Sequence, residues 1–448
     1  MDVTGELADY ISGKCFEDLT PEEKRVAGQC LLDYLGVTIA ARDEPLVQIL
    51  RETLLSEGFL PLASLVAGEE KVSLSQAAMI NGSAAHAHDY DDVHMSMSGH
   101  PTVPVAPAVL ALAEQLGSNP REVVLAFVTG LDTECLIGRY VGASHYARGF
   151  HATATLGTFG AAAACASLLG LDTGQCRHAL GLAATQAAGL KSMFGTMCKP
   201  FHAGKAAANG LLAAQLAARG FTSQLHGLEV FQGFGPTHSD TLSEEKLLKA
   251  LAEGQHVPKT LFKYHAACYL THSAMEGLRF LVTRHDIAPS DVDKILLKVD
   301  QGHFSVCNIQ EPATGLEAKF SLRFTAAMIL HGLNTASISD FSDTIVADAA
   351  LVSTRDRVEV EAFTDTPAAQ SGYSRVRVLL KDGRVFEKDW NVAVPEKNLD
   401  AQAIKLQEKF MSLSRPVLGE EKSNQIVALL DQIADQKSMA ELWSAIRM

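Results

Sequence analysis

Apolar residues recur at the spacing of one helical face along most of the chain up to about residue 285. Thr20-Pro-Glu-Glu has the N-cap and the first-position proline of a helix start, and apolar positions follow it through Val26, Leu31 and Tyr34. Ala-rich segments with Gly or Asp-Thr-Gly punctuation predict further helices. These segments are 74–88, 103–116, 120–142, 153–170, 172–189 and 203–219.

Beyond residue 285 the pattern changes to the alternation of apolar and polar residues that is typical of half-buried strands. One alternating segment leads into Asp382-Gly383, a hairpin-turn dipeptide, and helical spacing returns from about Asp400. We therefore predict a mainly α protein, with a large all-α-helical domain built from both chain ends and a smaller inserted α+β lid domain. The strands are expected at 294–299, 357–363, 375–380 and 385–390, the helical domain at 1–267 and 399–448, and the lid domain at 268–398.

Composition narrows the class of protein. The 448 residues are 47% hydrophobic and 20% charged, as in ordinary globular proteins, and the formal net charge of −14 argues against nucleic acid as a partner. An uninterrupted apolar run of membrane-spanning length is absent from the sequence, and the first ten residues lack the basic and apolar regions of a signal peptide. The eight cysteines are scattered without a C-x-x-C pair, so we expect reduced thiols and a cytoplasmic location.

The segment from Asn81 to Thr102 carries the densest set of titratable residues, with four histidines and three aspartates within fifteen positions. Such groups between apolar helices are costly unless they are paired or functional. The H-x-H-D-x-D-D spacing offers metal ligands, but no H-E-x-x-H or C-x-x-C pattern accompanies it. Acid–base or substrate-binding chemistry is the favoured interpretation, and a metal site or a structural network of capping and buried side chains are the alternatives.

Two further polar segments precede Ala-rich helices. Arg148 and His151 lie at a glycine-containing helix entrance, which suits an anionic group because free backbone N–H groups add to the cationic side chain. Lys199 is followed by Pro200, so we expect an extended residue just before the helix that carries Lys205. A lysine against apolar walls acts as a base or holds a carboxylate. Helix capping and solvent exposure are the structural alternatives.

A fourth polar segment, Lys263-Tyr-His-Ala-Ala-Cys-Tyr-Leu-Thr-His272, lies where the helical body is expected to give way to the inserted domain. Ligands often bind where domains meet. His272 is therefore a candidate for substrate binding, with a structural histidine at a helix start as the alternative.

Together the four segments resemble the MmgE/PrpD family over nearly the whole chain. The most specific motifs are His88-Asp-Tyr-Asp-Asp with His100-Pro, Arg148-Gly-Phe-His, Lys199-Pro-Phe-His-Ala-Gly and Thr271-His. The resemblance implies a helical domain with a smaller α+β lid, a homodimer, no metal or organic cofactor, and a small anionic carboxylate substrate. Members include 2-methylcitrate dehydratase, cis-aconitate decarboxylase and iminodisuccinate epimerase, all of which move a proton at a carbon beside a carboxylate.

The resemblance also implies roles for individual residues. For an epimerase we expect a base on each face of the stereocentre: Lys199 and, opposite it, His100 or Tyr146, with Asp89 orienting His100. The substrate carboxylates are expected to bind among further polar side chains around these bases. These predicted substrate-binding residues are His88, Asp92, Arg148, His151, Lys205 and His272.

Two positions depart from the decarboxylase branch of the family. Val93 stands where a threonine is expected after the aspartates, and Phe324 stands where a tyrosine is expected. Both changes remove hydroxyl groups that would bind or protonate a tricarboxylate, at a cost of about 1.5–3 kcal/mol for each hydrogen bond lost to a charged group. The expectation is therefore a cofactor-independent epimerase most similar to the iminodisuccinate branch, with a lyase of the same family as the alternative.

Overall fold

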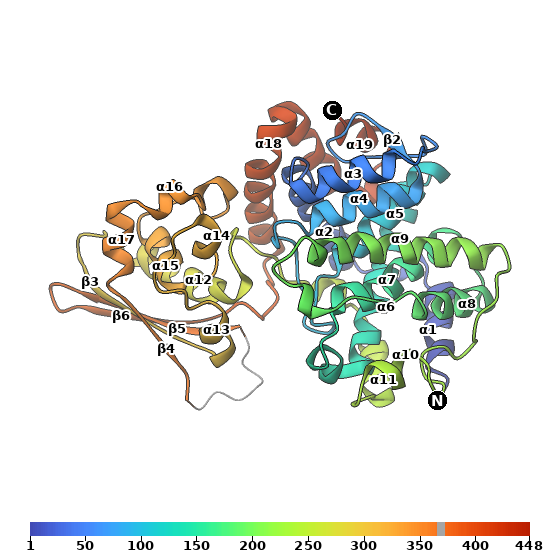
Figure 1. Cartoon of the computed structure of the whole chain (residues 1–448), viewed down its shortest axis with the longest axis horizontal. Coiled ribbons are helices and arrows are strands. Elements are labelled where there is room, and N and C mark those ends of the chain that lie inside the picture. The colour runs from blue at the N-terminus through green and yellow to red at the C-terminus, as the bar shows by residue number, and fades with distance from the viewer. Residues whose placement is uncertain (365–371) are drawn as a thin grey trace. The chain divides into compact units, whose positions relative to one another are not determined.

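The computed structural model describes residues 1–364 and 372–448, which form two compact units. One unit comprises Met1–Phe262 and Asn398–Met448, and the other comprises Lys263–Lys397. The boundaries predicted from the sequence were after residues 267 and 398. The mainly α class is confirmed, because helices account for most of the described residues and the strands form two small sheets (Figure 1).

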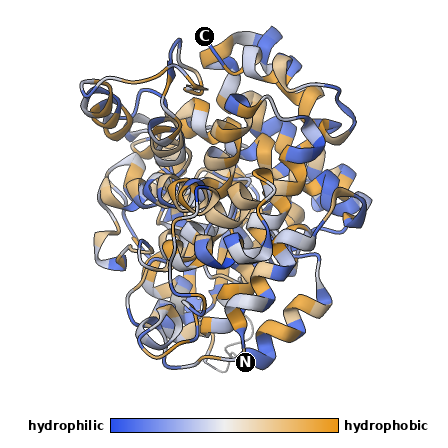
Figure 2. Ribbon diagram, turned by 90° about the vertical axis from the view of Figure 1, so that its right-hand side faces the viewer, coloured by the Kyte–Doolittle hydropathy of each residue, from blue (hydrophilic) through white to orange (hydrophobic). Residues whose placement is uncertain are grey.

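The unit built from both chain ends, called the helical unit below, is a set of packed helices with a two-stranded ribbon of β1 (Ala63–Ser64) and β2 (Lys71–Val72). Helices α7 and α9 lie at its centre, where α7 packs against α6 and α9, and α9 packs against α4. Figure 2 shows helices of this unit with bands of both hydrophobic and hydrophilic residues. Its helices are α1 Val3–Gly13, α2 Pro21–Ala40, α3 Pro45–Leu55, α4 Leu74–Ala85, α5 Thr102–Leu116, α6 Pro120–Ala147, α7 Ala152–Leu168, α8 Thr173–Ala184, α9 Cys198–Ala218, α10 Phe234–His238, α11 Glu244–Glu253, α18 Leu399–Asp431 and α19 Ala440–Ala445.

Small residues let the central helices approach closely. A Cβ atom added to Gly204 of α9 would lie 2.0 Å from the carbonyl oxygen of Met79 in α4, and one added to Gly210 would lie 2.6 Å from the backbone nitrogen of Ala162 in α7. Neither position accepts a side chain without moving a neighbouring backbone. The glycines therefore fix the distance of α9, which carries Lys199, from the helix that leads into the histidine-rich segment.

Helix α9 corrects one sequence-based expectation. Lys199 was expected to be extended before the helix because Pro200 follows it, but α9 begins at Cys198 and includes both residues. Proline is tolerated in the first turn, where its missing N–H group would have no partner within the helix. Lys199 is therefore held by a regular helix rather than by a loop.

The unit of Lys263–Lys397, called the inserted unit, contains a four-stranded sheet in the order β4-β3-β5-β6. Strand β3 (Val292–Val299) pairs parallel with β4 (Val358–Ala362) and antiparallel with β5 (Tyr373–Leu380), and β5 pairs antiparallel with β6 (Val385–Asn391). The predicted strands and the turn at Asp382-Gly383 are thus present, and Gly383 adopts a φ of 89°. The helices of this unit are α12 Tyr269–His285, α13 Gln301–Val306, α14 Gly315–Ala318, α15 Leu322–Leu330, α16 Asp343–Val346 and α17 Ala349–Arg355.

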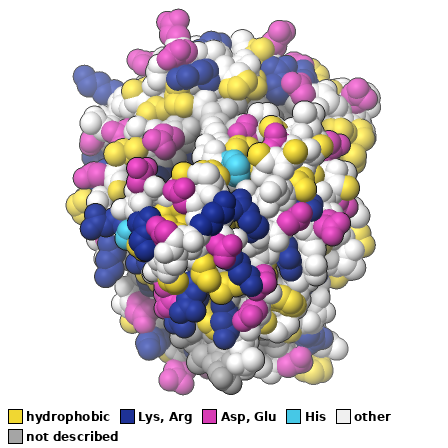
Figure 3. Space-filling model, turned by 90° about the vertical axis from the view of Figure 1, so that its left-hand side faces the viewer, with side chains coloured by type: hydrophobic (Ala, Val, Ile, Leu, Met, Phe, Trp, Pro, Cys, Tyr) yellow, Lys and Arg dark blue, Asp and Glu magenta, His cyan; other side chains and the backbone are white. Residues whose placement is uncertain are grey.

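The sheet of the inserted unit has one covered side. Helix α12 packs against β5 and β6, and the buried positions of β3, β4 and β5 alternate with exposed ones. On the other side, ion pairs join neighbouring strands, including Arg375 Nε to Asp389 Oδ1 at 2.7 Å and Arg377 Nε to Glu387 Oε2 at 3.0 Å. Figure 3 shows Lys and Arg interspersed with Asp and Glu on the face of the molecule that it presents.

None of the helices among the described residues combines the length and the apolar character that a membrane span needs.

Candidate active site

The histidine-rich segment joins α4 to α5 and is tied down along its length. Val93 and Leu261 exchange backbone hydrogen bonds of 2.8 and 2.9 Å, and His94 Nε2 lies 3.0 Å from the carbonyl oxygen of His256. At its end, the carboxylate of Asp92 accepts hydrogen bonds from the backbone N–H of Thr102 at 3.3 Å and from its hydroxyl at 2.5 Å. These contacts fix the later part of the segment, and side chains nearer its start contact other helices.

Asp89, His100 and Lys199 meet at a single carboxylate oxygen. Lys199 Nζ lies 2.9 Å from Asp89 Oδ1, and His100 Nε2 lies 3.5 Å from the same atom. The side chains of Asp89, Lys199 and His100 are 38%, 16% and 12% exposed, so they are the part of the cluster that solvent or a ligand reaches. Asp89 adopts a φ of 51°, a left-handed conformation that costs a residue other than glycine about 1–2 kcal/mol.

Asp91 and His86 form a buried layer behind this group. Asp91 Oδ2 lies 2.9 Å from both His100 Nδ1 and His86 Nδ1. Burial alone raises the pKa of the Asp91 carboxyl, but the nearby His100 and His86 outweigh it and hold the pKa well below its usual value. Asp91 therefore stays ionised and fixes the orientation of His100, as a carboxylate does for a catalytic imidazole.

His86 itself is neutral. Burial lowers the pKa of His86 to about 4, with Lys199 and His100 adding to the effect and Asp91 opposing it. Its Nε2 atom is buried and has no hydrogen-bond partner among the described residues. The ring lies edge-on to His100 at 4.5 Å between centroids and stacks near His151 at 5.7 Å.

A second pair of histidines approaches from α7 and α9. His151, at the N-cap of α7, places Nδ1 3.0 Å from His202 Nδ1, and His202 lies one helical turn beyond Lys199. Burial and the neighbouring His86 and Lys199 lower the pKa of His151 far below its usual value, so this imidazole is neutral. Phe194 packs edge-on to His151 at 4.9 Å, and Lys199 Nζ lies 5.4 Å from the centre of the Phe194 ring.

The arrangement around His100 consists of the Lys199 ammonium, the carboxylates of Asp89 and Asp91, and the neutral imidazoles of His86 and His151, with one partly exposed side. Lys199 and His100 both lie within reach of one point, now occupied by Asp89 Oδ1. A site that places a cation and a proton-transferring group around one position suits the removal or delivery of a proton next to developing negative charge.

Four donors of the cluster could also hold a metal ion. Ligand atoms of His86, Asp89, Asp91 and His100 all lie within 4.8 Å of one another. The ammonium of Lys199, 2.9 Å from Asp89, already supplies a positive charge to this group, and a divalent ion would have to compete with it. The side chains thus fit acid–base chemistry without requiring a metal.

Several predicted site residues lie elsewhere in the helical unit. The ring of Tyr146 faces Lys191, whose Nζ is 3.7 Å from its centre, and exposed Arg148 pairs with Asp240 at 3.0 Å. Lys205 is exposed on α9, about 240° around the helix from Lys199 at the usual 100° per residue. The ring of Tyr146 and the guanidinium of Arg148 thus contact residues other than Lys199 and His100, and Lys205 lies on a different side of α9 from Lys199.

Three further candidates have contacts of their own. His88 Nε2 lies 3.8 Å from Glu44 Oε1, and buried Asp92 is bonded to Thr102. His272 belongs to the inserted unit, where its Nε2 lies 3.1 Å from the carbonyl oxygen of Ala267. Burial lowers the pKa of His272 well below its usual value, so its imidazole is neutral.

The site residues predicted from the sequence include neither His86 nor Asp91, His202 or Phe194. The spacing of Lys199 and His202, three apart in what proves to be one helix, was the available signal for His202. No local pattern shows that Asp91, rather than Asp92, faces His100, because both aspartates lie in an irregular segment.

The side chains and their geometry suit acid–base chemistry on a helical scaffold. The chain belongs to the MmgE/PrpD family: residues 5–245 match the MmgE/PrpD N-terminal domain, and residues 265–433 match the MmgE/PrpD C-terminal domain. The predicted family is thus confirmed. The second match continues past the inserted unit into α18.

Curated relatives match along nearly the full chain. Cis-aconitate decarboxylase from Homo sapiens is 26% identical over 464 residues, covering 99% of this chain and 94% of the relative. Cis-aconitate decarboxylase from Mus musculus is 27% identical over 461 residues, covering 98% and 92%. Cis-aconitate decarboxylase from Aspergillus terreus is 27% identical over 477 residues, covering 98% and 95%. These named relatives are lyases, whereas the sequence favoured an epimerase.

Proposed function

We propose that the protein catalyses proton transfer at a carbon beside a carboxylate of a small di- or tricarboxylate, using its own side chains. The observation that carries this proposal is the convergence of Lys199 Nζ and His100 Nε2 within 2.9 and 3.5 Å of one oxygen of Asp89. A carbon acid of this kind is weak, and its carbanion needs a cation and a proton-transferring group at the same place.

The roles follow from the contacts. His100, held through Nδ1 by ionised Asp91, accepts the proton from carbon at Nε2. The Lys199 ammonium stabilises the resulting enolate and donates a proton, while Asp89 holds Lys199 toward His100. Neutral His151 and the Phe194 ring line the adjoining wall, and their low polarity strengthens the effect of the lysine charge.

The first candidate reaction is epimerisation of an N-substituted aspartate such as iminodisuccinate. Proton removal by His100 and return by Lys199 to the opposite face would invert the stereocentre. Val93 and Phe324 support this candidate because neither carries a hydroxyl group, and Phe324 is fully buried within the inserted unit. With these side chains the protein lacks two donors that the resemblance associates with a tricarboxylate.

The second candidate is decarboxylation of cis-aconitate, favoured by the similarity to cis-aconitate decarboxylases over 98–99% of the chain. In that reaction the carbon–carbon bond to a carboxylate breaks and CO2 leaves. The electron pair of the bond stays on the carbon that carried the carboxylate, and the Lys199 ammonium delivers a proton to that carbanion. The same two side chains thus serve both reactions, and the substrate decides between them.

The test is incubation of the purified protein in D2O with iminodisuccinate, cis-aconitate or 2-methylcitrate, followed by proton NMR and chiral chromatography. Epimerisation predicts deuterium at the stereocentre with inversion and no loss of carbon. Decarboxylation predicts CO2 release and deuterium in the product. Dehydration of 2-methylcitrate would place the protein with the third branch. If none of the three compounds exchanges hydrogen or reacts, the proposed function is wrong for these substrates.

We also expect a homodimer and a location in the cytoplasm, on the resemblance to the family and on the scattered cysteines. Sedimentation equilibrium of the purified protein measures the first, and fractionation of the source cells measures the second. A monomer at micromolar concentration would contradict the first expectation.

A further inference from the structure

A buried lysine from the end of the chain holds the backbone between the two site aspartates. Lys409, in α18, donates a hydrogen bond from Nζ to the carbonyl oxygen of Tyr90 at 2.7 Å. The same Nζ lies 3.9 Å from the centre of the Tyr90 ring. Tyr90 stands between Asp89, which contacts Lys199 and His100, and Asp91, which contacts His86 and His100. Lys409 is therefore bonded to the residue that lies between these two aspartates.

The ammonium of Lys409 is paired with a second buried group. Its Nζ lies 2.5 Å from Asp33 Oδ1, and the two side chains are only 2% and 1% exposed. Removing two charges from water is expensive, and such a pair is often no more stabilising than apolar residues of the same volume. A buried ion pair is thus poorly explained by stability alone, and its contact with Tyr90 gives it a further role.

The seam between α2 and α18 determines where Lys409 lies. Residues spaced four apart on one face of α2 contact α18: Arg25 pairs with Asp400 at 2.5 Å, and Gln29 accepts a 2.7 Å hydrogen bond from Gln402. Asp33 continues this row. A Cβ added to Gly28 would lie 2.4 Å from the carbonyl oxygen of Leu430, so the later part of α18 also packs directly on α2.

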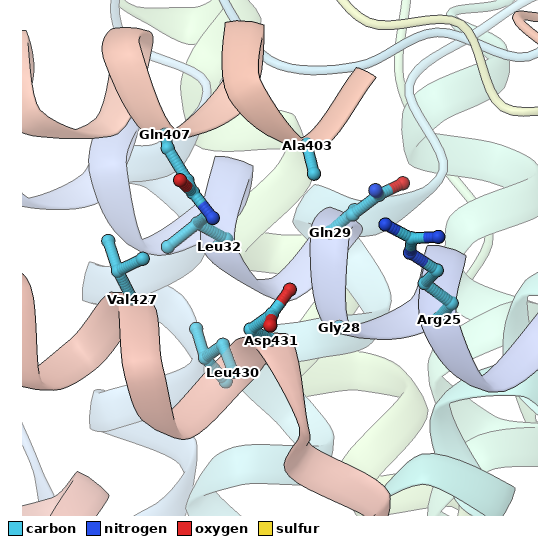
Figure 4. A pocket seen from close by; sticks show the side chains of 9 residues that line it. All are labelled: Arg25, Gly28, Gln29, Leu32, Ala403, Gln407, Val427, Leu430 and Asp431. Carbon is cyan, nitrogen blue, oxygen red and sulfur yellow. The ribbon is translucent and has the colours of Figure 1, made fainter. Parts of the chain in front are cut away.

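Figure 4 shows this seam, with Arg25, Gln29 and Leu32 of α2 facing Gln407 and Leu430 of α18. The cavity between them measures about 10 Å³, roughly the space of a single water molecule. Helices α2 and α18 are therefore closely packed, and α18 cannot shift along α2 without carrying Lys409 away from Tyr90.

We propose that Lys409 is a positioning residue for the active site, which holds the Tyr90 carbonyl and thereby sets the directions of the Asp89 and Asp91 side chains. The proposal rests on the proposed function, because its consequence for catalysis passes through His100 and Lys199. The left-handed backbone of Asp89, with φ of 51°, is the conformation that this hold maintains. The C-terminal segment thus contributes to the site without touching substrate.

The alternative is that Lys409 only neutralises Asp33. Three variants separate the two roles: Lys409→Met, Asp33→Asn, and the double variant that carries both changes. Asp33→Asn keeps the lysine and its bond to Tyr90. The double variant removes both charges, which should recover much of the stability lost in Lys409→Met, but it leaves Tyr90 without its donor. Lys437→Met, at an exposed lysine of the same terminal segment, is the matched control.

The expected results are as follows. Lys409→Met lowers the unfolding midpoint strongly, and the double variant recovers at least half of that loss. The kcat of the double variant is still about 10–100-fold below wild type with KM changed less than threefold, whereas Asp33→Asn keeps kcat within about threefold. The pH profile of kcat shifts in the double variant only. Lys437→Met behaves as wild type in every measurement.

A readout that does not depend on activity comes from NMR of protein labelled at its histidines. The side-chain signals of His100 and His86 are expected to move in the double variant and to keep their positions in Asp33→Asn and Lys437→Met. If the wild type turns over none of the tested carboxylates but these signals move as stated, positioning holds and the proposed function fails. If the double variant regains wild-type kcat and unchanged histidine signals, Lys409 merely balances Asp33 and the proposal is overturned.

Discussion

Both units of the chain place a histidine against a carboxylate, but His265 is fully buried whereas His100 is partly exposed. In the inserted unit, buried His265 lies 2.9 Å from Glu276 through Nε2 and 2.7 Å from the hydroxyl of Thr335 through Nδ1. In the helical unit, His100 reaches buried Asp91 on one side and partly exposed Asp89 on the other.

The difference shows that polar side chains among apolar helices do not by themselves mark a site. His265 has a partner at each ring nitrogen and is fully buried, which is how a protein accommodates a polar group in its core. The cluster of His100 adds an ammonium group, a left-handed aspartate and a buried imidazole nitrogen without a partner among the described residues. These three features together, rather than the number of histidines, distinguish the candidate active site.

The largest effect is expected from Lys199→Met. This change removes the ammonium proposed to stabilise the carbanion and takes away the group 2.9 Å from Asp89 Oδ1, so we expect turnover to fall by about 10²–10⁴-fold. The measurement is the rate of deuterium incorporation into the substrate that the wild type accepts. Lys205→Met, at an exposed position on another side of the same helix, serves as the matched control and should stay within about twofold. If Lys199→Met retained a tenth of the wild-type rate, the ammonium group would not distinguish the cluster of His100 from that of His265.

Asp89→Asn should have the next largest effect on activity. Asparagine keeps the shape of the side chain and one acceptor oxygen but not the charge, so Lys199 and His100 lose the negative charge that holds them together, and we expect kcat to fall by about 10–100-fold. Steady-state kinetics across pH 5–9 measures kcat and its pH dependence together. The exposed Asp293→Asn variant controls for the loss of one negative charge. An unchanged kcat and pH profile would mean that Asp89 does not orient the pair.

The contrast between the two clusters could only partly be predicted from sequence. Helix and strand positions follow from local spacing, which is why the strands near 294–299 and 375–380 were found. The polar segment that contains Asp89 and His100 also stands out locally. What spacing cannot provide is which side chains meet across the fold: Asp91 was passed over in favour of Asp92, and Lys409, 319 positions from Tyr90, carries no local signal at all.

In the inserted unit, His265→Phe should lower stability more than activity. The change leaves Glu276 and Thr335 without their imidazole partner in a buried setting, so we expect the free energy of unfolding to fall by about 2–4 kcal/mol. Urea denaturation gives this value, and kcat of the folded protein should stay within about threefold. His285→Phe, at an exposed histidine of the same helix as Glu276, should change stability by less than about 0.5 kcal/mol. If His265→Phe loses activity at unchanged stability, His265 is not the structural histidine that the comparison takes it to be.

Asp92 lies next to the cluster of Asp89, His100 and Lys199, but it is buried and bonded within the fold, as His265 is. The titration of Asp92 tests this assignment. Burial, with the charge of Asp33 adding to it, raises the pKa of the Asp92 carboxyl to about 8 from 3.8. Between these values the folded state binds one more proton than the unfolded state. The stabilising contribution is therefore complete below pH 4 and is lost as the pH rises through 8.

Asp92→Asn removes this titration, so its stability relative to wild type should rise by about 3–4 kcal/mol between pH 5 and pH 8. Urea denaturation at pH 5, 6.5 and 8 measures the difference. Asp293→Asn, at an exposed position, is the control and should keep the wild-type trend. If the difference in the free energy of unfolding between Asp92→Asn and wild type is the same at all three pH values, Asp92 is ionised in the fold. Asp92 would then belong with the charged groups of the candidate active site and not with the buried structural ones.

The smallest effect is expected from Arg148→Gln. Arg148 was predicted to bind substrate, but its guanidinium is 39% exposed and pairs with Asp240, a surface ion pair of a kind that contributes about 0–1 kcal/mol. We therefore expect stability to change by less than about 0.5 kcal/mol and KM by less than about twofold, measured by urea denaturation and initial rates. Asp240→Asn should behave in the same way if the pair is only a surface contact. A tenfold rise in KM for Arg148→Gln alone would mean that Arg148 leaves Asp240 to bind a substrate carboxylate. The open side of the site would then extend beyond Asp89, His100 and Lys199, and exposure in the free protein would be a poor guide to which cations bind substrate.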